Sequence, residues 1–282
     1  MKWPTDAAGW PMRDQSQIVL HRPHRWHIQR QGTGPKLILI HGAGGATQSW
    51  RALFPILAET CDVTAIDLPG QGFTQSGAQH RHGLDPMAED LNALLKHLSI
   101  TPDALVGHSA GVPIAMRMVE LGLPTKQVFG INAALSNFDG LAGWLFPLMA
   151  KALSITPFAA QVFAATSSPS SVRQLLEGTG SKIDEAGQAL YLRLAKDAAH
   201  VDGTLSMMAQ WSLDPLLARL PRFETPTHFL TASNDKAVPP ATSRSASERM
   251  PNATLTEVPD YGHLIHEEAP DLVANWIKER LA

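Results

Sequence analysis

Cysteine is nearly absent from this chain of 282 residues, since Cys61 is the only one. A single thiol cannot form a disulfide within the chain, and it cannot supply the cysteine pairs of a structural zinc site. An excess of basic charge is also missing, because 23 lysines and arginines are balanced by 26 aspartates and glutamates, a net charge of −3. These absences exclude a disulfide-stabilised fold, argue against nucleic acid as a partner and favour the reducing cytoplasm as the location.

Long uninterrupted apolar runs are missing as well. Residues 1–15 have no apolar run of seven or more residues behind their lysine, so they do not resemble a secretory signal. Residues 140–165 carry one charge, Lys151, but Pro147 and Pro157 interrupt them. A membrane-spanning helix needs about 20 mostly apolar residues and is rarely broken twice by proline. We expect a soluble protein whose contact with a membrane is at most peripheral.

The sequence does contain a regular alternation of short apolar strands with amphipathic helices. We expect strands at residues 36–40, 62–67, 104–106, 127–132, 228–233 and 253–258, and helices at 48–58, 86–98, 110–121, 240–250 and 270–281. This order predicts an α/β protein with a parallel sheet covered by helices on both faces. Residues 17–20 and 25–29 are expected to add an antiparallel hairpin at the sheet edge.

The alternation stops between residues 133 and 221, where no convincing strand is found. We therefore predict a core made of residues 1–132 and 222–282, with a helical cap at 133–221. The cap side chains that we expect to contact a substrate are apolar: Trp144, Phe146, Met207, Met208 and Trp211. Each of them also fits the core of the cap itself, and that alternative stays open. Together they predict a bulky hydrophobic substrate.

The pentapeptide GHSAG, residues 107–111, follows one predicted strand and precedes one predicted helix. G-x-S-x-G in this context is typical of a nucleophile elbow, in which a tight turn lifts the serine hydroxyl above the sheet. Gly107 and Gly111 would flank the turn because larger side chains would clash there. The alternative is a glycine-rich turn with an incidental serine. We predict Ser109 as a nucleophile at the positive end of the helix.

A serine hydroxyl needs a base within hydrogen-bond reach, and that base needs an acid to orient it. Asp235, in SNDKAVPP, and His263, in DYGHLIHEE, each follow a predicted strand, where the strand ends converge. We predict Asp235 as the acid and His263 as the base. A loop-capping role for Asp235 is the alternative. His266 is the rival base, placed at the start of the terminal helix.

The glycine-rich loop HGAGG, residues 41–45, follows the strand at 36–40. Such a loop supplies one backbone N–H to an oxyanion hole, and the residue after the nucleophile supplies the other. We predict Ala43 as the loop donor, with Gly44 as its alternative, and Ala110 as the second donor. A phosphate-binding loop is disfavoured, because no GK[ST] follows and the glycines do not fit GxGxxG.

Five histidines lie close together in the sequence, in HRPHRWH (positions 21, 24 and 27) and in HRH (positions 80 and 82). Neither a cysteine nor a carboxylate cluster stands beside them, so we interpret them as solvated loop or strand positions rather than metal or porphyrin ligands. The sequence therefore predicts no metal site and no cofactor.

Five segments, HGAGG, DLPGQGFT, GHSAG, SNDKAVPP and YGHLIHEE, resemble the α/β-hydrolase superfamily over nearly the whole chain. The resemblance implies the α/β-hydrolase fold, with a mostly parallel central sheet, helices on both faces and a helical cap insertion. Gln71 departs from the superfamily pattern, in which histidine is commoner. The segments WPMRDQSQIV, INAALSNFDGLAGWLFP and MMAQWSLDPL further resemble the magnesium-chelatase accessory proteins of bacteriochlorophyll biosynthesis.

These resemblances imply a function associated with magnesium insertion into protoporphyrin IX in a photosynthetic bacterium, with magnesium-chelatase subunits as partners and a tetrapyrrole as a substrate. The leading hypothesis is an esterase-like serine hydrolase that forms an acyl-enzyme intermediate. Two alternatives stay open at this point. One is a non-catalytic accessory or pigment-carrier protein that assists magnesium chelatase, and the other is a hydrolase of carbon–carbon bonds.

Overall fold

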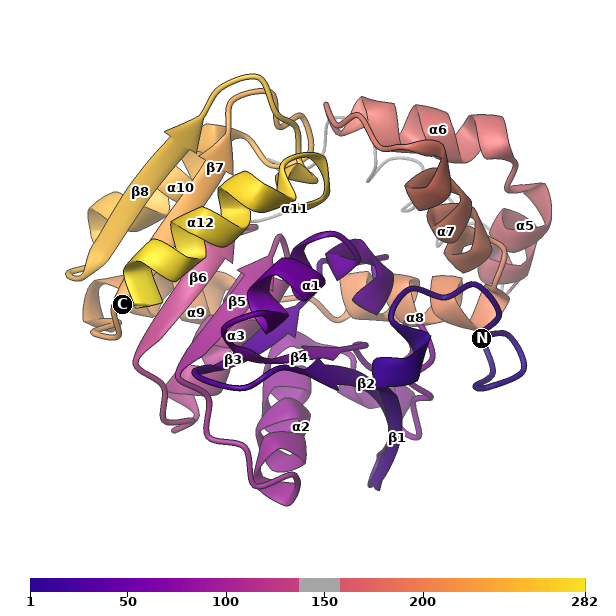
Figure 1. Ribbon diagram of the computed structural model, residues 1–282, viewed down its shortest axis with the longest axis horizontal. Coiled ribbons are helices and arrows are strands. Elements are labelled where there is room, and N and C mark those ends of the chain that lie inside the picture. Colours follow the sequence, from indigo (N-terminus) through magenta and orange to yellow (C-terminus); the bar gives the residue numbers. More distant parts are fainter. Residues whose placement is uncertain (137–157, 282) are drawn as a thin grey trace.

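The structure is a computed structural model that describes residues 1–136 and 158–281. Its centre is an eight-stranded sheet with the order β1-β2-β4-β3-β5-β6-β7-β8 (Figure 1). The strands are β1 (Ser16–His21), β2 (His24–Gln31), β3 (Lys36–Ile40), β4 (Asp62–Ile66), β5 (Ala104–His108), β6 (Gln127–Ile131), β7 (Thr227–Ala232) and β8 (Ala253–Val258). The predicted α/β class with a mostly parallel sheet is confirmed.

The pairing of the strands separates a parallel region from an antiparallel edge. β4, β3, β5, β6, β7 and β8 pair in parallel along the sheet. β1 pairs antiparallel with β2, and β2 pairs antiparallel with β4. The predicted edge hairpin is therefore confirmed. Parallel pairing matters for the site, because it brings the carboxyl ends of β5, β7 and β8 to the same edge of the sheet.

Strand β3 illustrates why both faces of the sheet are covered. Its side chains alternate between the faces, and all four apolar ones are fully buried. Leu37 and Leu39 pack with helices α1 (Leu53–Ala58) and α12 (Pro270–Leu281). Ile38 and Ile40 pack with the opposite layer: α2 (Leu84–His97), α3 (Gly111–Glu120), α9 (Asp214–Arg219) and α10 (Pro240–Arg249). The sheet is thus the middle of three layers.

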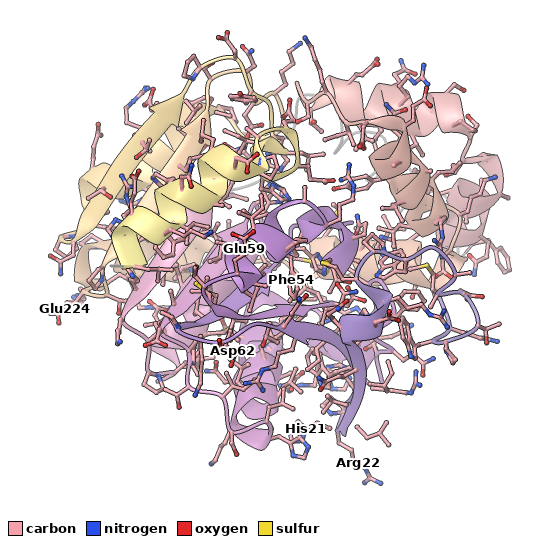
Figure 2. All side chains as sticks on the ribbon, in the orientation of Figure 1. His21, Arg22, Phe54, Glu59, Asp62 and Glu224 are labelled. Atoms are coloured by element: carbon pink, nitrogen blue, oxygen red, sulfur yellow. The ribbon has the colours of Figure 1, made fainter. Side chains whose placement is uncertain are left out.

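The helix expected at residues 48–58 differs from the observed structure. The chain forms a 3-10 helix, η2 (Thr47–Trp50), and then the short α1. Trp50 and Phe54 are still fully buried, so the apolar spacing identified the buried face correctly but not the helix type. Phe54 lies against the sheet, whereas Glu59 just beyond α1 is exposed (Figure 2).

The secondary structure that the described residues form between β6 and β7 consists of helices joined by short loops. It contains α5 (Ala159–Thr166), α6 (Pro169–Gly178), α7 (Glu185–Ala195), α8 (Ala198–Ala209), α9 and the 3-10 helix η4 (Leu220–Arg222). Figure 1 shows α5 to α8 grouped at one side of the sheet. The division into core and cap at residues 133 and 221 stays a prediction.

Two earlier expectations fall on residues 137–157, which lie outside the described part of the chain. They are the substrate contacts of Trp144 and Phe146, and most of the weakly charged segment considered for membrane contact. Within residues 1–136 and 158–281, every helix is too short or too polar to span a bilayer.

The expectation that the five clustered histidines are solvated is wrong for three of them. His24 and His27, on β2, are buried and pair with Asp90 at 3.0 Å and Asp67 at 2.7 Å. His82 is also buried, and its Nε2 contacts the Ser76 hydroxyl at 2.7 Å. Burial is possible because each imidazole has a polar partner. Histidine 80 is exposed, and histidine 21 lies at the turn of the hairpin (Figure 2).

Candidate active site

Ser109 lies in the sharp turn between β5 and α3. Its φ of 52° places it in the left-handed region, which a residue with a side chain adopts at a cost of roughly 1–3 kcal/mol. The turn is held by backbone hydrogen bonds: the Ser109 N–H donates to the Ile131 carbonyl at 2.9 Å, and the Ser109 carbonyl accepts from Val112 and Ala134. This strained geometry is that of the nucleophile elbow that the sequence predicts.

The two glycines of the elbow have no room for a side chain. A Cβ on Gly107 would lie 2.6 Å from the backbone of Gly111, and a Cβ on Gly111 would lie 2.1 Å from the Ile40 carbonyl oxygen. Both distances are far below van der Waals contact. The elbow can therefore pack against β3 only because positions 107 and 111 are glycine.

Asp235 and His263 form a buried pair beyond the ends of β7 and β8. The Nδ1 of His263 is 2.8 Å from Oδ2 of Asp235. The other carboxylate oxygen, Oδ1, accepts hydrogen bonds from the amides of Ala237 and Val238, both at 2.8 Å. An ionised carboxylate only accepts hydrogen bonds, so it favours the tautomer in which Nδ1 of His263 carries the proton. Nε2 is then left to act as an acceptor.

The loop that carries His263 is held by two residues that sequence reasoning missed as site residues. The His263 carbonyl accepts hydrogen bonds from Nδ2 of Asn132 at 2.8 Å and from Nε2 of His108 at 2.9 Å. Asn132 also accepts from the Ala232 amide at 2.9 Å, so it joins the ends of β6 and β7. The available signal for Asn132 was its position as the last residue of the strand predicted at 127–132.

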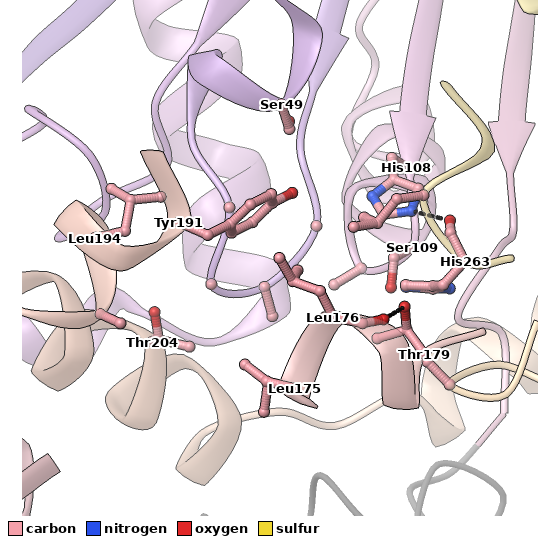
Figure 3. A pocket seen from close by; sticks show the side chains of 18 of the residues that line it. Ser49, His108, Ser109, Leu175, Leu176, Thr179, Tyr191, Leu194, Thr204 and His263 are labelled. Carbon is pink, nitrogen blue, oxygen red and sulfur yellow. Dashed lines mark hydrogen bonds between the residues drawn. The ribbon is translucent and has the colours of Figure 1, made fainter. Parts of the chain in front are cut away.

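His266, the rival base, lies in the short helix α11 (Ile265–Glu268) rather than at the start of the terminal helix. Its ring is fully buried, with centroids 4.3 Å from His108 and 4.7 Å from Trp50. Burial lowers the pKa of His266 to about 3. His263 lines the cavity beside Ser109 (Figure 3), whereas the His266 ring packs against His108 and is not among the described residues that line the cavity. The arrangement therefore favours His263 as the partner of Ser109.

The glycine-rich loop after β3 lies beside the elbow, and Ala43, Gly44 and Ala110 all line the same cavity as Ser109. The Gly44 N–H donates to Oε1 of Gln71 at 2.9 Å, so this amide is already engaged. Among the described residues, the amides of Ala43 and Ala110 have no hydrogen-bond partner. These two amides are therefore available to an oxyanion, while that of Gly44 is not.

Comparison with known proteins places this geometry in a family. The sequence profile of the alpha/beta hydrolase fold matches residues 35–270. The chain belongs to the α/β-hydrolase family. It is 43% identical over 278 residues to the magnesium-chelatase 30 kDa subunit of Rhodobacter capsulatus, covering 96% of this chain and 97% of that protein.

Solved structures agree on the fold. An alpha/beta hydrolase fold protein from Burkholderia ambifaria has a TM-score of 0.79 at 21% identity, covering 95% of this chain and 98% of the other. A putative lipase from Acinetobacter baumannii has a TM-score of 0.78 at 20% identity, covering 100% of this chain and 96% of the other. The predicted resemblance to the α/β-hydrolases is confirmed.

The cavity of this α/β-hydrolase measures about 200 Å³ and is mostly apolar. Figure 3 shows Ser109 and His263 on one side, with Leu176 and Tyr191 reaching in from α6 and α7. Of the five predicted cap contacts, Met207, Met208 and Trp211 line it. None of the described lining residues is Lys, Arg, Asp or Glu. The cavity therefore suits an uncharged apolar group.

In the parts of the chain that the structure places, no group of three His, Cys, Asp or Glu side chains is arranged to hold an ion. What the arrangement can do is acyl transfer: a strained serine, a histidine oriented by a carboxylate, and two backbone amides at one cavity.

Proposed function

We propose that the protein is a serine hydrolase that forms an acyl-enzyme intermediate on Ser109. His263 would take the hydroxyl proton as the oxygen attacks an ester carbonyl, and would then return that proton to the leaving alcohol. Asp235 would stabilise the charged imidazolium, and the amides of Ala43 and Ala110 would bind the developing oxyanion. The observation that carries the proposal is the Asp235–His263 hydrogen bond beside a serine in left-handed geometry.

The cavity supports a hydrophobic ester as the substrate class. Its volume of about 200 Å³ is below the roughly 300–1,000 Å³ of pockets that enclose drug-sized ligands. A bulky substrate such as a tetrapyrrole would therefore insert one ester-bearing arm and leave its ring outside the described lining. The absence of charged residues from that lining favours an esterified arm over a free carboxylate.

The biological setting that we propose is bacteriochlorophyll biosynthesis in a photosynthetic bacterium. The support is the 43% identity, over nearly the full length of both chains, to a magnesium-chelatase 30 kDa subunit. We infer an association with magnesium insertion into protoporphyrin IX, with chelatase subunits as partners. A cytoplasmic location suits this role and agrees with the single, buried cysteine.

The same identity favours a second candidate, a non-catalytic accessory or pigment-carrier protein that assists magnesium chelatase. The two candidates differ in whether Ser109 must react. We would label the purified wild-type protein, Ser109→Ala and the control Ser247→Ala with a fluorophosphonate. The three proteins would also be expressed in a strain that lacks the native copy, and magnesium-porphyrin production would be measured.

The hydrolase proposal expects labelling and pathway activity in the wild type and in Ser247→Ala, and the loss of both in Ser109→Ala. Full magnesium-porphyrin production by Ser109→Ala would favour the carrier. A wild-type protein that fails to react with the fluorophosphonate would contradict the hydrolase proposal directly.

A further inference from the structure

Three successive peptide groups of the glycine-rich loop are fixed by hydrogen bonds. The Gly42 carbonyl accepts from Nδ1 of His41 at 2.7 Å. The Gly44 N–H donates to Oε1 of Gln71 at 2.9 Å, and the Gly44 carbonyl lies 3.2 Å from Nε2 of His200. Ala43, the predicted oxyanion donor, is therefore held from both sides.

The direction of each histidine contact follows from the backbone group that it meets. An amide can only donate, so Nδ1 of His200 accepts from the Gly72 N–H at 3.0 Å. The proton of His200 must then sit on Nε2, which donates to the Gly44 carbonyl. His41 has the opposite tautomer, because its Nε2 accepts from the Leu68 N–H at 3.0 Å. Burial lowers the pKa of His200 to about 4, so its ring is neutral near pH 7.

These contacts determine where the Ala43 N–H points. In a trans peptide the carbonyl and the N–H point in opposite directions. Because the Gly42 carbonyl is turned toward His41, the Ala43 N–H of the same peptide is turned away from it. The next two peptides are fixed through Gln71 and His200. Gly44 has a φ of 76°, a conformation in which glycine is readily accommodated.

His200 reaches the loop from α8, a helix of the predicted cap that lies in very close contact with the core. A Cβ on Gly203 would lie only 2.3 Å from the Gly70 carbonyl oxygen, so the backbones of α8 and the loop after β4 meet without intervening side chains. One turn further along, Sδ of Met207 lies 3.3 Å from Nε2 of Gln71. Helix α8 therefore fixes both His200 and Gln71.

We propose that His200 and Gln71 are positioning residues that aim the Ala43 N–H at the oxyanion, so that helix α8 completes the oxyanion hole. The inference rests on the proposed function, because it requires a reaction at Ser109. Neither side chain needs to touch the reacting atoms. Each acts by holding Gly44, and a displacement of about 1 Å at such a donor can cost 100-fold in rate.

Two substitutions of His200 separate its two contacts. His200→Gln can place an amide nitrogen where Nε2 lies and keep the bond to the Gly44 carbonyl. His200→Asn can place an oxygen where Nδ1 lies, which keeps the bond to Gly72 but loses the one to Gly44. We expect His200→Asn to lower kcat for a short apolar p-nitrophenyl ester, and the rate of fluorophosphonate labelling, by about 10- to 100-fold with little change in KM. His200→Gln should retain most of the activity.

Gln71 provides an independent arm of the experiment. Gln71→Met removes the acceptor of the Gly44 N–H, and we expect it to lower kcat as His200→Asn does. Gln71→Glu keeps an oxygen acceptor and should be less impaired. Leu205→Ala is the control, because Leu205 is a buried residue of α8 in a separate apolar cluster. It should lower the Tm without a comparable loss of kcat.

Equal activities of His200→Asn and His200→Gln, or a loss of kcat in Leu205→Ala as large as that in His200→Asn, would overturn the inference. A wild type that labels at Ser109 together with fully active variants would overturn the inference alone. A wild type that never labels would overturn the proposed function as well. If the variants fail to fold, ¹⁵N NMR of the wild type decides: we expect the proton of His200 on Nε2 at pH 7, and a proton on Nδ1 contradicts the geometry.

Discussion

At the scale of single residues, the two oxygens of the Asp235 carboxylate have different partners. Oδ2 faces Nδ1 of His263, and Oδ1 accepts from the amides of Ala237 and Val238. The hydrogen bonds from these two amides fix the rotation of the carboxylate. The orientation of the His263 ring is therefore set by the backbone that follows β7. Residues of the loop after β7 thereby position the His263 side chain through Asp235.

Asp235→Asn tests this orientation. The side-chain oxygen of Asn can still accept the hydrogen bonds from the two backbone amides. The side-chain NH₂ group would then face Nδ1 of His263 and favour the tautomer with the proton on Nε2. We expect a loss of about 10⁴-fold in kcat, as for the same change in other Ser-His-Asp sites, with an almost unchanged Tm. The measurement is ester hydrolysis with Asp260→Asn, an exposed position, as the control. Activity within a few-fold of the wild type would contradict the assigned role.

Gly111→Ala tests the lack of space at the elbow. The new Cβ would overlap the Ile40 carbonyl, so β3 and α3 would have to separate. We expect a destabilisation of about 3 kcal/mol or more, measured by chemical denaturation. Gly122→Ala is the matched control: its φ is 92° but nothing lies within 4 Å of its Cβ, so we expect a cost of only about 1–2 kcal/mol. A cost for Gly111→Ala no larger than that for Gly122→Ala would contradict the lack of space at position 111.

Ser109, Asp235 and His263 could be predicted because each follows an apolar strand, and parallel strands end at a common edge. Their roles as a triad stay a prediction until the labelling experiment is done. His200 and Gln71 could not be predicted in the same way. His200 lies 156 residues from its partner Gly44, inside a helix, and no local pattern indicates which loop it meets. Such contacts depend on tertiary packing.

At the scale of elements, an ion-pair network that extends from a buried carboxylate to an exposed one joins three segments near the site. Glu267 of α11 accepts a hydrogen bond from the Tyr191 hydroxyl of α7 at 2.7 Å, and pairs with Arg51, which directly follows η2. Arg51 also pairs with Asp184, the N-cap of α7. The network thus ties a predicted cap helix to the segment that carries His263. It connects the orientation of α7 with the position of the base.

Glu267→Gln tests the electrostatics of this network. Burial raises the pKa of Glu267 from 4.5 to about 7, although Arg51 opposes the shift. Because the fold favours the protonated form, the associated stability is present below pH 4.5 and is lost as the pH rises through 7. Between pH 4.5 and 8, we expect the free energy of unfolding of the wild type to fall by up to about 3 kcal/mol relative to that of Glu267→Gln. Urea denaturation measures this difference. If the unfolding free energies of the wild type and Glu267→Gln changed in parallel with pH, the raised pKa of Glu267 would be contradicted.

Element boundaries were predictable where one strand or helix had a clear apolar pattern. Strands β3 and β8 and helix α12 begin and end at the predicted residues. The predicted helix at 48–58 was wrong, since the same spacing of buried residues is satisfied by a 3-10 helix followed by an α-helix of six residues. Periodicity reports which side chains are buried, and tertiary packing selects the backbone that buries them.

At the scale of the whole molecule, buried neutral histidines should make the fold sensitive to acid. Burial lowers the pKa of His200 to about 4 and that of His266 to about 3, and it also lowers the pKa of His41 and His108. The unfolded chain binds these protons near pH 6.5, so stability is lost as the pH falls from 6.5 toward 3. Between its folded-state pKa and its unfolded-state pKa, each histidine lowers the free energy of unfolding by about 1.4 kcal/mol for each unit of pH decrease. The sum over these histidines outweighs the opposite effect of Glu267.

We therefore expect the Tm to fall steadily between pH 7 and pH 4.5. His266→Phe should flatten this dependence, because the His266 ring has no hydrogen-bond partner among the described residues and packs against two rings. His80→Gln, at an exposed position, should leave it unchanged. The measurement is thermal unfolding by circular dichroism at half-unit pH steps. A Tm that does not change with pH would refute the expectation.

The close backbone contact between Gly203 and Gly70 limits how this protein can be re-engineered. Helices between β6 and β7 are attractive segments to exchange between family members when a new specificity is wanted. Here a donor helix with any side chain at position 203 would collide with the Gly70 carbonyl. A donor helix with neither histidine nor glutamine at position 200 would leave the Gly44 carbonyl without this hydrogen bond. An active chimaera must therefore take α8, the glycine-rich loop and the loop after β4 together from the same donor protein.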